Sequence, residues 1–243
     1  MNDGYLLEGY HSEAAAYARP SARIAFIRRT YAHLAGAVIA FVGLTALLMS
    51  AGIGDRFLLA VMTQKVSWLL VLGAFIGVSY LARWMARSQA PPATQYLGLA
   101  LYVVAQAIIF LPMLALAEHK FPGKHIALQA GIMTLIVFGG LTASVFLTKK
   151  DFSFLGHGLM VLAWLALGLI FCALIFHFES LLGMWFSFAM IALACGFILY
   201  DTSNVLHHHG TDEHVAASLE LFASVALLFW YILRLIMETS SND

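Results

Sequence analysis

Long apolar segments, separated by short polar ones, dominate the chain after about residue 33. A helix of about 20 apolar residues is long enough to cross the ~30 Å hydrocarbon core of a bilayer. Segments of this kind fall at 34–52, 66–85, 96–117, 126–148, 157–177, 181–200 and 216–236. None of them shows the alternation with a period of two that a membrane barrel requires, so the pattern predicts helices as the spanning elements.

This pattern divides the chain into three parts. We expect a polar amino-terminal tail over 1–33, a seven-helix membrane domain over 34–236 and a short carboxyl-terminal tail over 237–243. The first segment lacks the apolar core and small-residue cleavage site of a signal peptide. The loops between the spans are short and leave no room for a second, soluble domain. The predicted fold class is therefore an all-α membrane protein.

The composition agrees with this prediction. Hydrophobic residues make up 62% of the chain and charged residues 11%, whereas an ordinary soluble domain has about 25% charged residues. The mean hydropathy is +0.87. Thirteen basic residues balance thirteen acidic ones, so no net charge attracts nucleic acid. A typical water-soluble enzyme and a disordered chain are both excluded.

The distribution of Lys and Arg between the two predicted membrane faces suggests an orientation. The face that carries the amino-terminal segment holds Arg19, Arg23, Arg28, Arg29, Arg83, Arg87, Lys149 and Lys150, and the opposite face holds Arg56, Lys65, Lys120, Lys124 and Arg234. Because cytoplasmic loops carry an excess of Lys and Arg, we expect the amino terminus to lie in the cytoplasm.

Small residues gather in two of the predicted spans. They are Gly73 and Gly77 in the second span, and Gly139, Gly140, Ala143 and Ser144 in the fourth. Such residues let helix backbones approach closely within lipid, so we expect helix contacts there. A kink or the lining of a cavity is the alternative.

Two carboxylates lie within or next to predicted spans. Asp201 follows the sixth span, and Glu220 lies about one turn inside the seventh, four residues before Ser224 and hence on the same helix face. Asp201 either faces water or caps a helical turn, or it faces the bundle interior, where it senses protons or holds a cation. Glu220 is either interfacial or faces that interior as well. Close approach of the two carboxylates would make a proton-linked pair.

Histidines offer a second candidate chemistry. His207, His208 and His209 form a tract that suggests weak binding of a transition metal, but adjacent residues do not face one another on a helix, and a solvated loop is the alternative. His33 and His157 have no spacing that argues for haem. Because no His-Glu-x-x-His motif or nucleophile elbow is present, we expect no enzymatic activity and no cofactor.

Four segments carry a resemblance to a known family. They are Phe26-Ile27-Arg28-Arg29-Thr30-Tyr31, Lys149-Lys150-Asp151-Phe152-Ser153-Phe154-Leu155, Leu199-Tyr200-Asp201-Thr202-Ser203-Asn204, and the seventh span from Leu219 to Leu235. From about residue 24 onward the chain resembles the Bax inhibitor-1, or transmembrane Bax inhibitor motif, family. Within that family it is similar to the bacterial YccA-like branch.

The resemblance implies a bundle in which six helices surround a central seventh helix. Several members of the family are pH-sensitive calcium leak channels whose sensor is a pair of aspartates. Asp201 corresponds to the first aspartate, and Ser224, which cannot carry a negative charge, occupies the second position. Glu220, one turn away, is then a partial substitute. We further expect Arg83 or Arg87 to hold ionised Asp201 by hydrogen bonds, and Asp201 to bind calcium transiently.

Three classes of function stay open at this point. The first is a pH-gated leak for cations, with calcium or protons as its partners. The second, implied by the YccA-like branch, is a non-conducting modulator of the membrane protease FtsH, which would engage the amino-terminal tail in membrane protein quality control. The third is an intramembrane hydrolase or a haem protein. The resemblance also implies that the protein lies in a bacterial inner membrane.

Overall fold

The computed structural model describes residues 14–63, 65–87, 90–176 and 182–241, apart from the side chains of 65–69 and 174. Within these ranges the chain is helical and contains no β-strand, only an isolated bridge between Ala14 and Gly210. The helices are α1 (Pro20–Ser50), α2 (Ile53–Thr63), α3 (Lys65–Met85), α4 (Pro92–Lys120), α5 (Ile126–Thr148), α6 (Leu155–Phe176), α7 (Met184–His207) and α8 (His214–Ser240).

Six of the described helices are long and apolar enough to cross a membrane. They are α1, α4, α5, α6, α7 and α8, and a shorter apolar stretch, Leu70–Met85, lies in α3. The all-helical membrane architecture is thus confirmed, whereas the count of seven spans is not. The described part of the chain also adds α2, a helix of 11 residues in a region predicted to be a loop.

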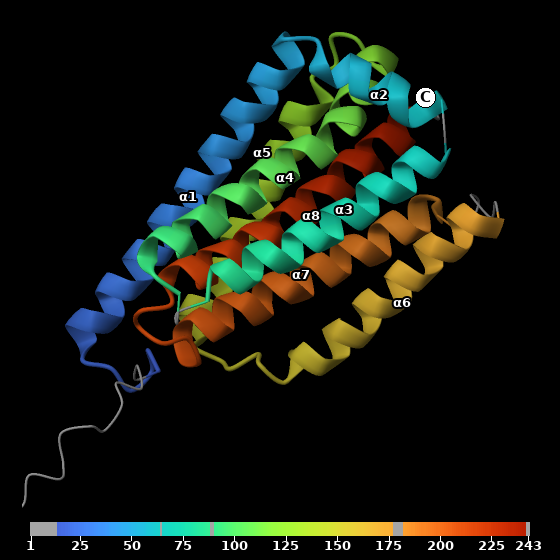
Figure 1. The fold of residues 1–243 in the computed structure, drawn as a ribbon. Coiled ribbons are helices and arrows are strands. Elements are labelled where there is room, and N and C mark those ends of the chain that lie inside the picture. Colours follow the sequence, from blue (N-terminus) through green and yellow to red (C-terminus); the bar gives the residue numbers. More distant parts are fainter. Residues whose placement is uncertain (1–13, 64, 88–89, 177–181, 242–243) are drawn as a thin grey trace, which may run out of the picture.

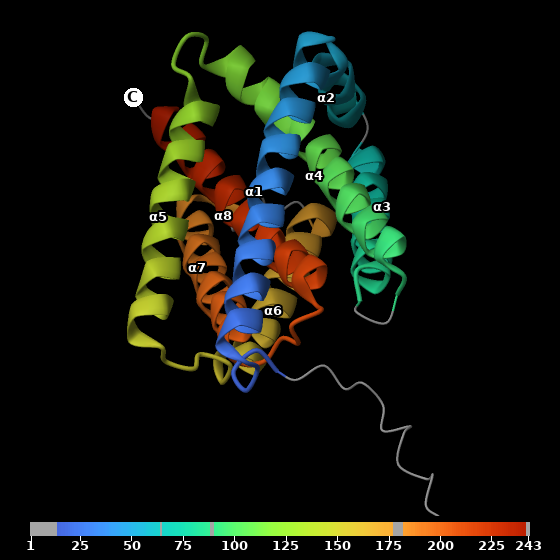
Figure 2. The same cartoon turned by 90° about the vertical axis from the view of Figure 1, so that its left-hand side faces the viewer.

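The last helix lies inside the bundle. Helix α8 contacts α1, α4, α5 and α7, and Figure 2 shows it crossing behind α1 with α5 and α7 beside it. Leu219, Leu221, Leu228 and Leu233 are at most 1% exposed. These leucines point in different directions around α8, so the helix is buried by neighbours on several sides.

Helices α3 and α6 lie at the periphery. Helix α3 packs mainly on α4, and α6 packs on α7 (Figure 1). Large apolar side chains of α6 are more than half exposed, among them Met160 and Trp164. In a bilayer such side chains contact lipid, which explains why a helix that few neighbours cover is still apolar.

Two helix ends lie far from their predicted positions. The region 201–215 was predicted as a loop, but α7 continues to His207 and α8 begins at His214. The prediction was wrong because Val205 and Leu206 are buried and extend the apolar face of α7 beyond Asp201. Asp201 therefore lies within a helix and not in a solvated loop. At the amino-terminal end, α1 begins at Pro20 and so extends into the segment predicted as a tail.

The small residues singled out in the sequence do not mark helix contacts. A Cβ atom added at Gly73, Gly77, Gly139 or Gly140 would meet no other atom within 4 Å. These glycines are exposed, so the prediction of close packing there was wrong. The close approach occurs instead at Gly98 of α4, where a Cβ would lie 2.7 Å from the carbonyl oxygen of Ala82 in α3.

The amino-terminal segment before α1 joins the loop between α7 and α8. The Ala15 backbone N–H donates a hydrogen bond of 2.8 Å to the His209 carbonyl oxygen. Ala15 is fully buried and belongs to a cluster of buried apolar residues. The segment from Ala14 to α1 is thus attached to the end of the bundle at which α7 ends and α8 begins, called the Asp201 end below.

Candidate functional site

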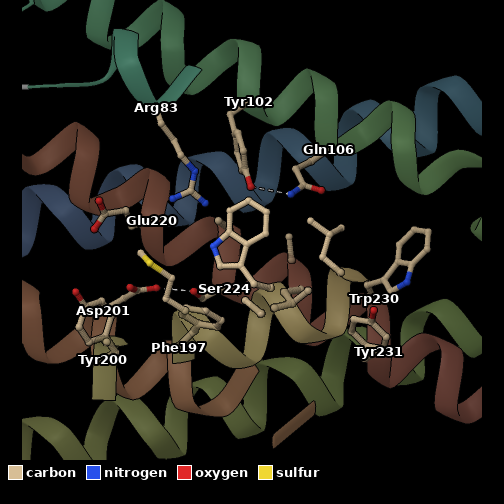
Figure 3. Close-up of a pocket in the computed structure, with 18 of the residues that line it drawn as sticks. Arg83, Tyr102, Gln106, Phe197, Tyr200, Asp201, Glu220, Ser224, Trp230 and Tyr231 are labelled. Atoms are coloured by element: carbon tan, nitrogen blue, oxygen red, sulfur yellow. Dashed lines mark hydrogen bonds between the residues drawn. The ribbon is translucent and has the colours of Figure 1, made fainter. Parts of the chain in front are cut away.

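A cavity of about 1360 Å³ lies along α8. Its lining extends from Glu220 to Arg234 of α8, a length of about 21 Å at 1.5 Å per helical residue. Helices α3, α4, α6 and α7 provide the other walls. Figure 3 shows that Asp201, Ser224 and Glu220 gather at one end of this cavity, with Trp230 and Tyr231 toward the other.

Asp201 and Ser224 are in direct contact. Asp201 Oδ2 accepts a hydrogen bond of 2.5 Å from Ser224 Oγ, and the two residues are 7% and 6% exposed. This bond joins the adjacent helices α7 and α8 (Figure 3). A carboxylate this deeply buried needs such a donor, because an unsatisfied charge is costly in an apolar medium. The position that lacks the second acid therefore supplies a donor to the first.

Glu220 is bound by a histidine clamp. His209 Nε2 lies 3.1 Å from Glu220 Oε2, and His209 Nδ1 lies 3.0 Å from Glu213 Oε2. With a carboxylate at each ring nitrogen, His209 is an imidazolium that donates both hydrogen bonds. Burial lowers the pKa of His209, but the bonds to Glu213 and Glu220 outweigh burial and raise this pKa to about 10. We call His209, Glu213 and Glu220 the histidine clamp.

The predicted pair of carboxylates is thus divided between two partners. In the described part of the chain, the side-chain partner of Asp201 is Ser224 and that of Glu220 is His209. Both carboxylates line the same cavity. The two carboxylates thus make one end of the cavity acidic, although among the described residues each has a different hydrogen-bond donor.

The two predicted arginines differ in position. Arg83 lines the cavity from α3, and its Cζ lies 5.9 Å from the centre of the Tyr102 ring. Arg87 is exposed, lies beyond the end of α3 and does not contribute to the lining. Figure 3 shows the Arg83 guanidinium pointing toward the acidic end from the opposite wall. Arg83 therefore adds positive charge to the site, whereas Arg87 lies outside it.

The three adjacent histidines point to three different partners. His207 Nδ1 lies 3.0 Å from the Ser203 carbonyl oxygen of its own helix, and His208 Nε2 lies 3.1 Å from Asp151 Oδ2. His209 belongs to the histidine clamp. The tract does not converge on a metal, in agreement with the geometry of adjacent residues, and the described residues contain no group of three or more His, Cys, Asp or Glu side chains able to hold a metal ion.

Asp151 connects the loop between α5 and α6 to α7. It accepts a hydrogen bond of 2.9 Å from the Ser153 backbone N–H and one of 3.2 Å from Ser203 Oγ. The Ser153 bond, aided by His208, holds the pKa of Asp151 well below its usual range. The Phe152 backbone N–H also donates to Ser203 Oγ, at 2.8 Å. The Asp-Phe-Ser sequence of the loop thus attaches the loop to α7 beside the cavity, whose lining includes Ser153.

The two histidines considered for haem, His33 and His157, do not share a site. His157 lines the main cavity, whereas His33 lies in a second cavity formed by α1 and α4. His33 Nδ1 is 2.7 Å from the Arg29 carbonyl oxygen, and its ring lies 5.1 Å from that of His214. A haem held jointly by His33 and His157 has no support in this arrangement.

Sequence reasoning missed two parts of the site. The first is the histidine clamp, although the spacing of four between His209 and Glu213 was a visible signal for a local ion pair. The second is a polar pair on the opposite wall, in which Gln106 Nε2 donates to the Tyr102 hydroxyl at 3.1 Å. The Tyr102–Gln106 spacing is also four, but within an apolar span it looks no different from other buried positions.

Comparison with known proteins gives a consistent result. Residues 23–242 match a family model described as inhibitor of apoptosis-promoting Bax1. Bax inhibitor 1 of Schizosaccharomyces pombe is 31% identical over 230 residues, which cover 92% of this chain and 80% of that protein. Protein lifeguard 4 of Mus musculus is 33% identical over 136 residues, covering 56% of this chain and 57% of that protein.

A bacterial protein is also similar. An uncharacterized protein of Pseudomonas aeruginosa is 28% identical over 127 residues, covering 50% of this chain and 54% of that protein. No solved structure is significantly similar to this chain. The matches confirm the resemblance to the family that the sequence motifs indicated, and they indicate the YccA-like branch only loosely.

Proposed function

This chain belongs to the Bax inhibitor family, and from this premise we propose that it is a pH-sensitive cation leak with calcium as a substrate. In this proposal the amino terminus lies in the cytoplasm of a bacterial cell and the protein resides in the inner membrane. The protein transports and does not catalyse a reaction. One observation carries the proposal: a buried carboxylate, Asp201, lies in the wall of a cavity that follows α8 for most of the thickness of a bilayer.

The cost of burying Asp201 supports this reading. Ionisable side chains at membrane depth are rare, and those that occur mark ion or proton pathways. A cation at the Asp201 end would meet the carboxylates of Asp201 and Glu220 and the side chain of Asn204, all of which line the cavity. Calcium prefers six to eight oxygen ligands. Fewer ligands bind it weakly, which suits passage through the site.

Protonation of Asp201 is the proposed gate. When Asp201 is ionised, its bond from Ser224 is charge-assisted and holds α7 against α8. When Asp201 is protonated, the bond becomes one between neutral groups and is weaker. The change favours the arrangement in which α7 and α8 are separated at this end, and a two-state bundle then shifts its population with pH.

The test is calcium flux into liposomes that contain the purified protein, at pH 6 and pH 8. We expect a flux above that of empty liposomes, and a rate ratio between the two pH values that Asp201→Asn removes. Asp212→Asn is the matched control, because Asp212 is exposed and does not line the cavity. A flux no greater than that of empty liposomes at both pH values would refute conduction.

The alternative function is modulation of FtsH without conduction. Its support is the similarity to a bacterial relative and the attachment of the segment at Ala15 to the loop at His209. Force applied to the amino terminus by a protease would reach this loop. The part of the tail before Ala14 lies outside the described residues.

The two functions respond to different changes. Deleting residues 2–12 would abolish an effect on FtsH activity while leaving Ala14 and Ala15 available for the loop. Asp201→Asn would not alter that effect. The leak would instead be favoured if Asp201→Asn abolished the calcium flux and the deletion of residues 2–12 left the effect on FtsH activity unchanged.

A further inference from the structure

The cavity is open toward one side of the bundle. Met160 and Trp164 of α6 line it and are 61% and 68% exposed. Leu72 and Phe75 of α3 line the facing wall. These residues lie well inside apolar helices, so the opening between α3 and α6 would face hydrocarbon in a bilayer and not water.

The two ends of the cavity differ in chemistry. Toward Arg234 the lining includes the aromatic side chains of Trp164 and Trp230. At the Asp201 end both signs of charge occur: Arg83 comes from one wall, and Asp201 and Glu220 come from the other (Figure 3). Arg83 has no salt bridge among the described residues, and its contact there is the Tyr102 ring.

We propose that this cavity binds a phospholipid with a zwitterionic headgroup that carries a primary ammonium, as in phosphatidylethanolamine. Arg83 binds the phosphate and Glu220 accepts hydrogen bonds from the ammonium. One acyl chain enters between α3 and α6 and extends toward Trp230. The proposal goes beyond the leak and does not depend on conduction.

Length and charge both fit this lipid. A single leaflet accounts for about half of the ~30 Å hydrocarbon core, so a cavity of about 21 Å accepts one acyl chain along its axis. An anionic headgroup would be repelled, because the three carboxylates of Asp201, Glu213 and Glu220 outnumber the two cations Arg83 and His209 at the Asp201 end of the described lining. A choline headgroup carries no N–H donor for a carboxylate. An ammonium–phosphate headgroup satisfies both signs of charge.

Fluorescence quenching by brominated lipids tests the proposal. The chain has five tryptophans. A variant that retains only Trp230, with the others replaced by Phe, is reconstituted with phosphatidylethanolamine, phosphatidylcholine or phosphatidylglycerol brominated on the same acyl chain. We expect phosphatidylethanolamine to quench Trp230 with a relative affinity about tenfold above that of the other two, the usual effect of charge-assisted hydrogen bonds.

Matched variants locate the effect. Glu220→Gln in the Trp230 protein should remove the preference, because Glu220 contacts the ammonium, whereas Arg83→Gln should lower the affinity for all three lipids, which share the phosphate. Arg87→Gln should change neither, because Arg87 lies outside the cavity. A protein that retains only Trp185, which is 86% exposed, reports surrounding lipid and should be quenched equally by all three. Native mass spectrometry of the unmodified protein should show retained phosphatidylethanolamine.

Equal quenching of Trp230 by the three lipids, or a preference that survives Glu220→Gln, would overturn the proposal. The absence of retained phosphatidylethanolamine in the mass spectrum would count against it even if a variant failed to fold. No ion gradient is present in these experiments. The result is therefore independent of whether the protein conducts calcium.

Discussion

Ser224 of α8 donates a hydrogen bond of 2.5 Å to the carboxylate of Asp201 in α7. The two positions correspond to the aspartate pair that the family resemblance implies, and here they are an acceptor and a donor. A serine in place of an acid thus preserves the contact between the helices and removes one of the two charges. The buried carboxylate depends on this donor because both residues are almost inaccessible to solvent.

Replacement of Ser224 by Ala should destabilise the protein. The Asp201 carboxylate would lose its donor while staying buried, at a cost of about 1–3 kcal/mol. Thermal unfolding in detergent measures the effect. The control is Ser218→Ala, since Ser218 is fully buried in the same helix and its donor partner in the described part of the chain is the Val215 carbonyl oxygen. Equal effects of the two substitutions would show that Asp201 does not depend on Ser224.

Much of the fold follows from the apolar segments, whose centres lie within α1 and α3 through α8. The ends could not be predicted because burial, and not hydropathy, decides them. Phe26 and Thr30 precede the first apolar segment and flank Arg28 and Arg29, yet both are buried against the bundle and extend α1. Helices that emerge from the membrane carry such mixed sequences.

The sequence predicted which residues belong to the site better than it predicted which of them are in contact. Periodicity placed Glu220 and Ser224 on one helix face, and both line the cavity. The partners of the two carboxylates required the packing of α7 against α8 and the position of His209. The glycine prediction was wrong for a related reason: inside a bilayer, lipid-facing and protein-facing surfaces are both apolar, so sequence alone does not distinguish them.

A methyl group at Gly98 should separate α4 from α3. Its Cβ would lie 2.7 Å from a backbone carbonyl oxygen, which cannot rotate away. Gly98→Ala should therefore cost about 1–3 kcal/mol, as overpacking does. Gly139→Ala adds the same methyl where no atom lies within 4 Å. Thermal unfolding of the two variants in detergent should show a loss only for Gly98, and an unchanged unfolding temperature for Gly98→Ala would contradict the contact.

Removing the Asp151 side chain should loosen the loop between α5 and α6. Asp151→Ala eliminates the acceptor of Ser153 N–H and of Ser203 Oγ, and a hydrogen bond contributes about 1 kcal/mol. Amide exchange over residues 149–156 should become about fivefold faster, because local opening needs less free energy. Asp212→Ala, in the exposed loop before α8, serves as the control. Unchanged exchange over this segment would show that Asp151 does not hold it.

The histidine clamp predicts a loss of stability at alkaline pH. The folded-state pKa of His209, about 10, lies above the ordinary value of 6.5. The folded state therefore binds the proton more tightly, and the resulting stabilisation is fully present below pH 6.5 and is lost as the pH rises through about 10. Replacing His209 by Gln removes the titrating group but keeps a polar side chain of similar reach.

The measurement is the unfolding temperature of both proteins between pH 6 and pH 10.5 in detergent. At pH 6 the unfolding temperature of the native protein should be higher than that of His209→Gln. The difference between the two unfolding temperatures should shrink steadily toward pH 10.5. His208→Gln is the control, because His208 is about half exposed and contacts Asp151 instead of the clamp. A difference that does not depend on pH would mean that His209 stabilises the loop by packing alone. The same variant keeps the main-chain carbonyl oxygen that accepts from the Ala15 N–H, but it loses the side-chain bonds to Glu213 and Glu220 that position this carbonyl, so the contact with Ala15 should weaken. Faster amide exchange at Ala15 in His209→Gln would therefore link the amino-terminal segment to the histidine clamp.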